Sequence, residues 1–301
     1  MSERNQANGF SLYGAEHVHR AVSRPQYAIW TSLFPICPSI LTLAAFLSGY
    51  IIAVERNDEE KWFSFISDGG AVSPESCIFG LLLNFAAFFY TFTLTQYMEF
   101  HHLDGCGWGF ARWLLLCTGI ASGVGVCVVA NFQETNVPIA HGWGAWFAFF
   151  GGLFYVWTYV IISSIVKPSF VPTFLTFSRG LLALITTIAL ATHMVTQIAA
   201  PFVKEDANGF KPPRPTAAPH LVTRLHPGEP WYLNHLIATI SEWVLGVTFQ
   251  IVILTFAFES DTMHATCLDE EQLEEVADWP ELKNIKVLDT SVGHIHPIST
   301  S

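Results

Sequence analysis

Eight polar residues lie in or beside segments that are otherwise apolar: Asp68, Glu75, Asn84, Asn131, His141, His193, Gln197 and Glu242. Ionisable groups at such positions are costly in a membrane and often mark function. Histidine titrates near neutral pH, so His141 and His193 together with Glu242 could respond to acidity. His193 and Gln197 are four residues apart, which places them on one face of a helix. The set predicts a polar pocket that binds a lipid headgroup or senses pH.

A purely structural interpretation of the same eight residues stays open, in which they form hydrogen bonds between helices and lock the bundle. The sequence contains no HExxH, GxSxG or P-loop motif and no Ser-His-Asp order. Its six cysteines have neither CxxC spacing nor a Cys/His metal pattern. We therefore expect no enzymatic activity, no cofactor and no bound metal.

The elements that would hold these residues are transmembrane helices. Hydrophobic residues make up 51% of the 301 residues and charged residues 13%, where soluble domains carry about 25% charged residues. A membrane-spanning helix needs about 20 mostly apolar residues. Six segments meet this requirement: 29–54, 77–99, 113–130, 142–166, 180–200 and 235–258. The predicted fold is an all-α membrane protein, a bundle of six transmembrane helices over 29–258, flanked by segments 1–28 and 259–301.

The distribution of charge favours cytosolic termini. With the ends in the cytosol, that side carries eight Lys and Arg, counting Arg179 as a loop residue, and the opposite side carries six. All eight polar residues would then face the lumen or the exterior. The tail after Phe258 holds ten of the 25 acidic residues and could bind a basic cytosolic partner or stay solvated. The net charge of −11 argues against nucleic acid as a partner.

Small residues recur at helical spacing in the third and fourth segments. Gly119 and Gly123 form a GxxxG pair, and Gly142, Gly144, Gly151 and Gly152 follow in the next segment. Glycine lets helix backbones approach closely, which favours packing in lipid. The sequence leaves open whether these residues pack within one chain or between two chains.

Three longer motifs carry a family resemblance. They are 66–80 (ISDGGAVSPESCIFG), 131–145 (NFQETNVPIAHGWGA) and 241–256 (SEWVLGVTFQIVILTF). Their order and positions resemble the damage-regulated autophagy modulator family, within the wider Frag/DRAM/Sfk superfamily, over residues 28–260. The matching positions are Ser67, Asp68, Pro74, Glu75, Phe79, Asn84, Asn131, Gln133, His141, Gly144, Glu242 and Trp243. The resemblance implies six helices with cytosolic ends.

The resemblance also implies an endomembrane location, often the lysosome, and a role in autophagy or lysosomal function. The leading hypothesis is therefore a non-enzymatic membrane modulator that binds lipid or a membrane-protein partner through a lumenal polar pocket. One alternative is a small-solute or proton-coupled transporter. Another is a plasma-membrane phosphoinositide regulator or a lipid-remodelling protein, as the resemblance to more distant relatives suggests.

Overall fold

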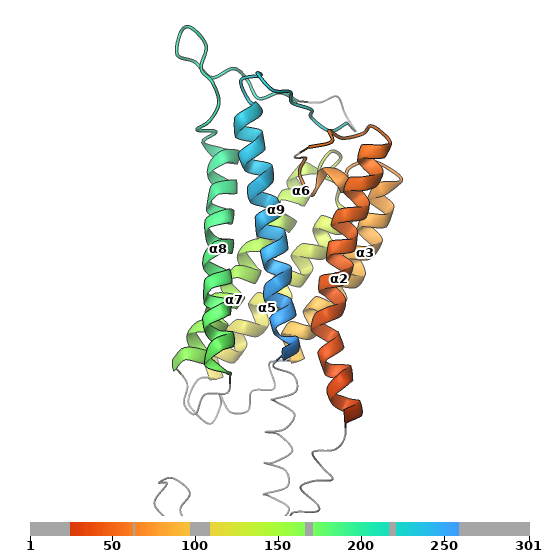
Figure 1. The fold of residues 1–301 in the computed structure, drawn as a ribbon, viewed down its shortest axis with the longest axis vertical. Coiled ribbons are helices and arrows are strands. Elements are labelled where there is room, and N and C mark those ends of the chain that lie inside the picture. Colours follow the sequence, from red (N-terminus) through yellow and green to blue (C-terminus); the bar gives the residue numbers. More distant parts are fainter. Residues whose placement is uncertain (1–24, 63, 97–108, 166–170, 217–220, 259–301) are drawn as a thin grey trace, which may run out of the picture. The chain divides into compact units, whose positions relative to one another are not determined.

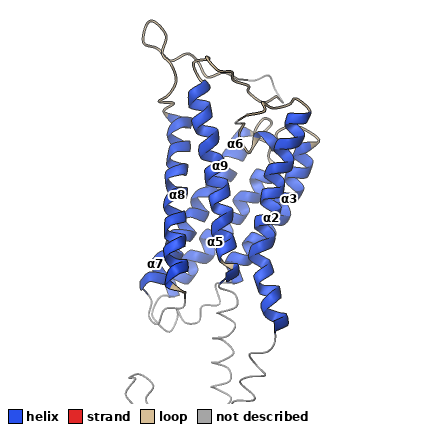
Figure 2. Ribbon diagram, in the orientation of Figure 1, coloured by secondary structure: helices blue, strands red, loops and turns tan. Residues whose placement is uncertain are grey.

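The computed structural model describes residues 25–62, 64–96, 109–165, 171–216 and 221–258, which form a helical bundle (Figure 1). The long elements are α2 (Pro25–Glu55), α3 (Glu75–Gln96), α5 (Gly109–Asn131), α6 (Pro138–Trp146), α7 (Gly152–Ile165), α8 (Thr173–Ile198) and α9 (Tyr232–Thr255). A 3-10 turn, η1 (Asp68–Gly70), precedes α3, and a π-helical turn, η2 (Phe147–Gly151), joins α6 to α7. These residues contain no β-strand (Figure 2).

Six helical segments are long and apolar enough to cross a membrane, which confirms the predicted all-helical, six-span fold class. The fourth runs continuously from α6 through η2 to α7, Pro138–Ile165. The cytosolic position of the termini stays a prediction. The acidic tail 259–301 and residues 1–24 lie outside the described residues. The chain divides into two compact units, and the unit Gln26–Asp261 contains all the described residues except Pro25.

Several helices begin before the apolar segments read from the sequence. The α8 helix starts at Thr173, directly after Pro172, and α6 starts at Pro138. Proline suits the first turn of α6 because the amide it lacks would have no partner there, and Pro172 is the N-cap of α8. The first turn of α8 therefore contains polar residues such as Thr173, which the hydropathy of the sequence assigns to a loop.

The α2 helix is joined to helices on both of its sides. Its Pro38 has no amide hydrogen for the carbonyl of Phe34, one turn earlier. The Thr93 hydroxyl of α3 donates to that carbonyl at 2.9 Å. The Ser39 hydroxyl donates to the carbonyl of Gln250 on α9 at 3.2 Å. In a bilayer no water is present to satisfy the Phe34 carbonyl, so Thr93 stabilises the part of α2 that contains Pro38, and Ser39 joins that part to α9.

Glycines allow α5 and the fourth spanning helix to pack closely. A Cβ on Gly125 would lie 2.7 Å from the carbonyl oxygen of Gly144, and a Cβ on Gly144 would lie 3.0 Å from the Val129 nitrogen. Any side chain at these positions would push the helices apart. The predicted Gly119 and Gly123 pair faces α3, with Leu94 and Thr91 as neighbours. These glycines therefore pack within the chain.

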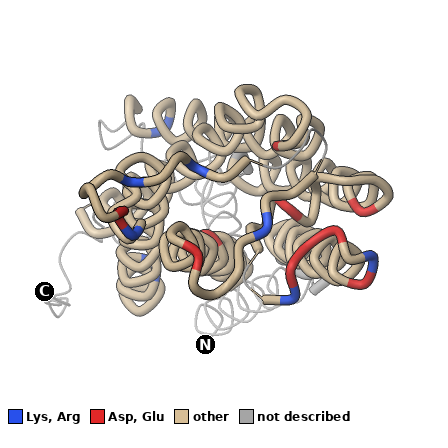
Figure 3. The backbone as a smooth tube through the Cα atoms, turned by 90° about the horizontal axis from the view of Figure 1, so that it is seen from above, with Lys and Arg blue, Asp and Glu red and all other residues tan. Residues whose placement is uncertain are grey.

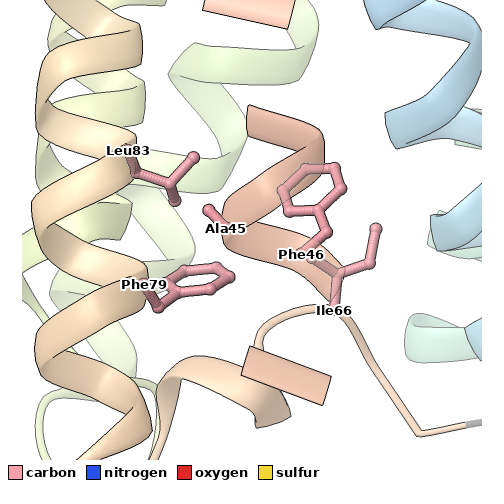
Figure 4. Close-up of a cluster of buried hydrophobic side chains, with 5 residues drawn as sticks. All are labelled: Ala45, Phe46, Ile66, Phe79 and Leu83. Atoms are coloured by element: carbon pink, nitrogen blue, oxygen red, sulfur yellow. The ribbon is translucent and has the colours of Figure 1, made fainter. Parts of the chain in front are cut away.

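A buried cluster joins α2, α3 and the loop between them (Figure 4). Ala45 and Phe46 come from α2, and Phe79 and Leu83 come from α3. Ile66 belongs to the loop but is only 6% exposed. The first loop is therefore part of the core, and this position brings its polar residues toward the bundle interior.

The assignment of Arg179 to a loop, made from the sequence, is wrong. The residue lies inside α8 and is 1% exposed. Its Nε and Nη2 donate to the hydroxyl and carbonyl of Thr255 at 2.8 and 3.0 Å. The guanidinium carbon lies 4.3 Å from the ring centroid of Phe256 and 5.2 Å from that of Tyr159. The carboxyl end of α9 and two aromatic rings together stabilise the buried charge.

We expect Arg179→Lys to destabilise the bundle by about 1–3 kcal/mol, because one ammonium cannot reproduce the forked hydrogen bonds and the ring stacking. Thermal unfolding in detergent measures the change. Arg112→Lys is the matched control, since Arg112 is half-buried and its guanidinium carbon lies 5.7 Å from the ring centroid of the adjacent Trp113. Equal melting temperatures for the two variants would contradict the assignment.

Candidate functional site

The first loop is held against α9 by the carboxyl of Glu242. The Ile66 amide donates to Glu242 Oε2 at 3.1 Å. The indole nitrogen of the adjacent Trp243 donates to the carbonyl of Ser64 at 3.0 Å. A carboxyl inside an apolar helix needs donors from the protein itself. The loop backbone supplies them, so Glu242 and the first loop fix each other's position.

A close backbone approach places the same loop against α2. A Cβ on Gly69 would lie 2.8 Å from the Tyr50 nitrogen, and a Cβ on Gly49 would lie 2.5 Å from the Gly69 carbonyl oxygen. Only glycine fits at either position without a shift of backbone. This contact buries η1, including Asp68, which is 8% exposed.

The connection between α5 and α6 closes over the first loop. The Ser67 hydroxyl donates to Glu134 Oε2 at 2.6 Å, and the Thr135 hydroxyl donates to the Ala71 carbonyl at 3.1 Å. His141 Nδ1 hydrogen-bonds with the Phe132 carbonyl at 2.7 Å. These contacts position one acidic and one imidazole side chain beside Glu242. Figure 3 looks onto the end of the bundle where these loops lie and marks their charged residues.

Three adjoining cavities lie at this end of the bundle. The apolar cavity, of about 100 Å³, is lined mainly by side chains such as Phe46, Phe79 and Phe249. Polar residues also line it, among them Ser67, His141 and Glu242. The same three residues line the central cavity of about 320 Å³, so the two spaces meet at Glu242.

Most of the other polar residues of the site also line the central cavity. His193, Gln197, Glu134 and Arg214 line it, and His193 Nδ1 lies 3.2 Å from the Ala238 carbonyl oxygen. An outer cavity of about 510 Å³ shares Phe65, Glu134, Gln197 and Arg214 with it and adds Asp68, Asn234 and His235. Five of the eight predicted residues thus gather around these cavities: Asp68, His141, His193, Gln197 and Glu242.

The other three predicted residues line none of the three cavities. Asn84 and Asn131 form a reciprocal amide pair, with N···O distances of 2.9 and 3.2 Å, that joins α3 to α5. Glu75 is fully buried at the start of α3, and its Oε2 lies 3.8 Å from Arg56 Nε. The Asn84–Asn131 pair is the kind of contact that the structural interpretation describes, whereas neither carboxyl oxygen of Glu75 has a hydrogen-bond partner among the described residues.

Several polar residues of the cavities were not among the eight candidate site residues read from the sequence, and the charged and amide side chains of Glu134, Asn234 and Arg214 are examples. Glu134 lies within the 131–145 motif, between two residues that were selected, so its position was a usable signal. Asn234 stands just before the apolar segment 235–258 and is now within α9. Arg214 belongs to the proline-rich loop, where nothing in the sequence sets it apart.

Two acidic residues outside the spanning segments are held in unfavourable surroundings. Burial raises the pKa of Asp68 well above its ordinary value, and the nearby carboxyls of Glu134 and Glu59 raise it further. Burial also raises the pKa of Glu59 to about 7, although the Ser64 hydroxyl donates to it at 2.6 Å. The acidic groups therefore repel one another in a poorly solvated region. Among the described residues, no three His, Cys, Asp or Glu side chains form a metal-ion site.

Six spanning helices with cavities among them define a multi-pass α-helical membrane protein. The chain belongs to the Frag1/DRAM/Sfk1/Cwh43P family, whose N-terminal domain model matches residues 30–263. The match confirms the resemblance inferred from the three sequence motifs. No solved structure matches the chain significantly.

Several characterised proteins are similar to this chain. DNA damage-regulated autophagy modulator protein 2 of Bos taurus is 30% identical over 230 residues, which cover 75% of this chain and 82% of the relative. Protein 1 of that name from Mus musculus is 29% identical over 228 residues, covering 73% and 87%. Modulator of macroautophagy TMEM150B of Homo sapiens is 33% identical over 138 residues, covering 44% and 58%.

The raised pKa of Glu59 predicts a pH-dependent stability. The folded protein binds this proton up to about pH 7, whereas the unfolded chain releases it near pH 4–5. Stability from this group is therefore present at low pH and falls as pH rises through 7, by on the order of 1–3 kcal/mol. We expect Glu59→Gln to raise the melting temperature in detergent at pH 8 and to change it little at pH 4. The opposite order would show that folding stabilises the ionised carboxylate and lowers the pKa of Glu59.

Proposed function

We propose that this protein is a non-enzymatic membrane modulator of autophagy that binds an amphiphilic lipid. The observation that carries the proposal is that the apolar cavity and the central cavity, which is lined by more charged residues, share Ser67, His141 and Glu242. An amphiphile likewise joins an apolar chain to a polar head. Ligand sites in proteins are typically apolar clefts with a few converging polar groups, and the cavities have this composition.

We infer that the central cavity opens toward the membrane between α6 and α8. Gly142 lines it, and a Cβ there would meet nothing within 4 Å. Trp146 lines it as well and is 46% exposed, while Leu190 and Met194 form the α8 side. A lipid could thus pass between the membrane and the cavity without crossing the headgroup layer.

The relatives' names support the biological part of the proposal, since two DNA damage-regulated autophagy modulators and a modulator of macroautophagy are similar to this chain. We propose a lysosomal or other endomembrane location with cytosolic termini, which would turn the cavities toward the lumen. Partners would be membrane lipids, a membrane protein that binds the lipid-bound form, and a cytosolic protein bound by the acidic tail.

Filling the cavity should abolish activity while the protein still folds. Gly142→Leu places a side chain in open space, and Glu242→Gln replaces the ionisable carboxyl shared by the two cavities with an amide. In cells lacking the endogenous protein, we expect both variants to reach the membrane but to lose most rescue of autophagic flux. They should also lose labelling by a photoactivatable lipid. The control is Ala191→Leu, because Ala191 is exposed on α8 and lines none of the three cavities.

Full flux and full lipid labelling in both variants would refute a role for the cavity. Protein-dependent solute uptake by liposomes, lost in the same variants, would instead support the transporter alternative.

Location and sidedness can be measured together with a tag placed after Ser301. We expect the tag to be accessible from the cytosol in cells permeabilised only at the plasma membrane, and the protein to be found with lysosomal markers. A plasma-membrane location would favour the phosphoinositide alternative. A lumenal tag would reverse the orientation and place the cavities on the cytosolic side.

A further inference from the structure

The outer cavity contains a buried acceptor without a donor. Asn234 is 4% exposed, and its Nδ2 donates to the Thr196 carbonyl at 2.9 Å. Its Oδ1 has no hydrogen-bond partner among the described residues, and the side chain lines the outer cavity. Leaving a buried acceptor unsatisfied is unfavourable. A ligand that fills this cavity should therefore present a hydrogen-bond donor.

The charged residues around the cavities favour a cationic donor. Asp68 and Glu134 line the outer cavity, and Glu134 and Glu242 line the central one. Among the described residues, Arg214 is the one Lys or Arg side chain that lines either cavity. The carboxyls lie close enough that Glu134 raises the pKa of Asp68, after the larger effect of burial. A bound cation would relieve this repulsion and stabilise the ionised carboxylates.

Aromatic rings at the same place suit an ammonium group. Phe65 and Trp231 line the outer cavity. The Phe65 ring lies edge-on to those of His193 and His235, at centroid distances of 6.0 and 5.0 Å, which fixes its orientation. Aromatic faces beside carboxylates form the usual protein site for organic ammonium ions.

We propose that the outer and central cavities bind the ammonium head of a membrane amphiphile, held by Glu134, Asp68 and the Asn234 carbonyl oxygen. This inference rests on the proposed lipid-binding function and names the class of lipid. The ammonium group belongs either to a zwitterionic phospholipid, whose phosphate would contact Arg214, or to a single-chain amine without phosphate. An anionic head without an amine would meet mostly carboxylates and be repelled.

Native mass spectrometry of the full chain in detergent tests the lipid class. The probes are phosphatidylethanolamine, phosphatidic acid with the same acyl chains, and sphingosine. We expect at least one amine lipid to bind tenfold or more tightly than phosphatidic acid. Glu134→Gln should weaken amine binding about tenfold without changing phosphatidic acid binding. Glu205→Gln, in the exposed loop, is the control and should change neither.

Arg214→Gln separates the two sources of the amine. It should weaken phosphatidylethanolamine binding if the ligand is a phospholipid, and leave sphingosine binding unchanged or stronger if the ligand is a single-chain amine. If phosphatidic acid binds as tightly as the amines, or if Glu134→Gln has no effect on them, the inference is wrong. In that case, if lipids still bind and Gly142→Leu still abolishes their binding, the proposed function stands. If none of the probes binds, both the ammonium-head inference and the proposed lipid-binding function are wrong.

Discussion

The hydrogen bond from the Ile66 amide to Glu242 is the interaction on which the arrangement of this protein depends. A carboxyl within an apolar helix requires donors, and the first loop supplies a backbone amide at 3.1 Å. To reach Glu242 the loop descends into the bundle, where Ile66 enters the core and Ser67 meets Glu134. Residues of this loop line all three cavities, with Ile66 and Ser67 in the apolar one and Phe65 in the other two.

Most of the fold could be predicted from the sequence because the bilayer constrains it strongly. The thickness of the hydrocarbon sets the length of each apolar segment, and all six segments became helices. Glu242 stood out for the same reason, as an acid among apolar residues. The short connection between α5 and α6 brought Asn131 and His141 near each other, but only the structure shows that His141 lines a cavity while Asn131 joins α5 to Asn84.

Hydropathy reports the depth of a residue along the membrane normal and says little about its neighbours around the helix. Arg179 was placed in a loop because its charge marked a boundary, yet Thr255 and Phe256 from a distant segment surround it. Glu75 has the depth expected of a cavity residue but lies on another side of the bundle, near Arg56. Arg214 comes from a loop whose path over the helices depends on tertiary contacts.

The π-helical turn at Phe147–Gly151 has a consequence for changes in chain length. A π turn holds about one residue more than an α turn, so it rotates all later residues by roughly 100°. Before it, His141 faces the cavities, and after it, Tyr155 and Tyr159 are buried in the core. Removing one residue here would restore a regular helix but turn those tyrosines away from their partners. The length of this segment therefore sets the rotation of the core-facing half of this helix relative to the half that faces the cavities.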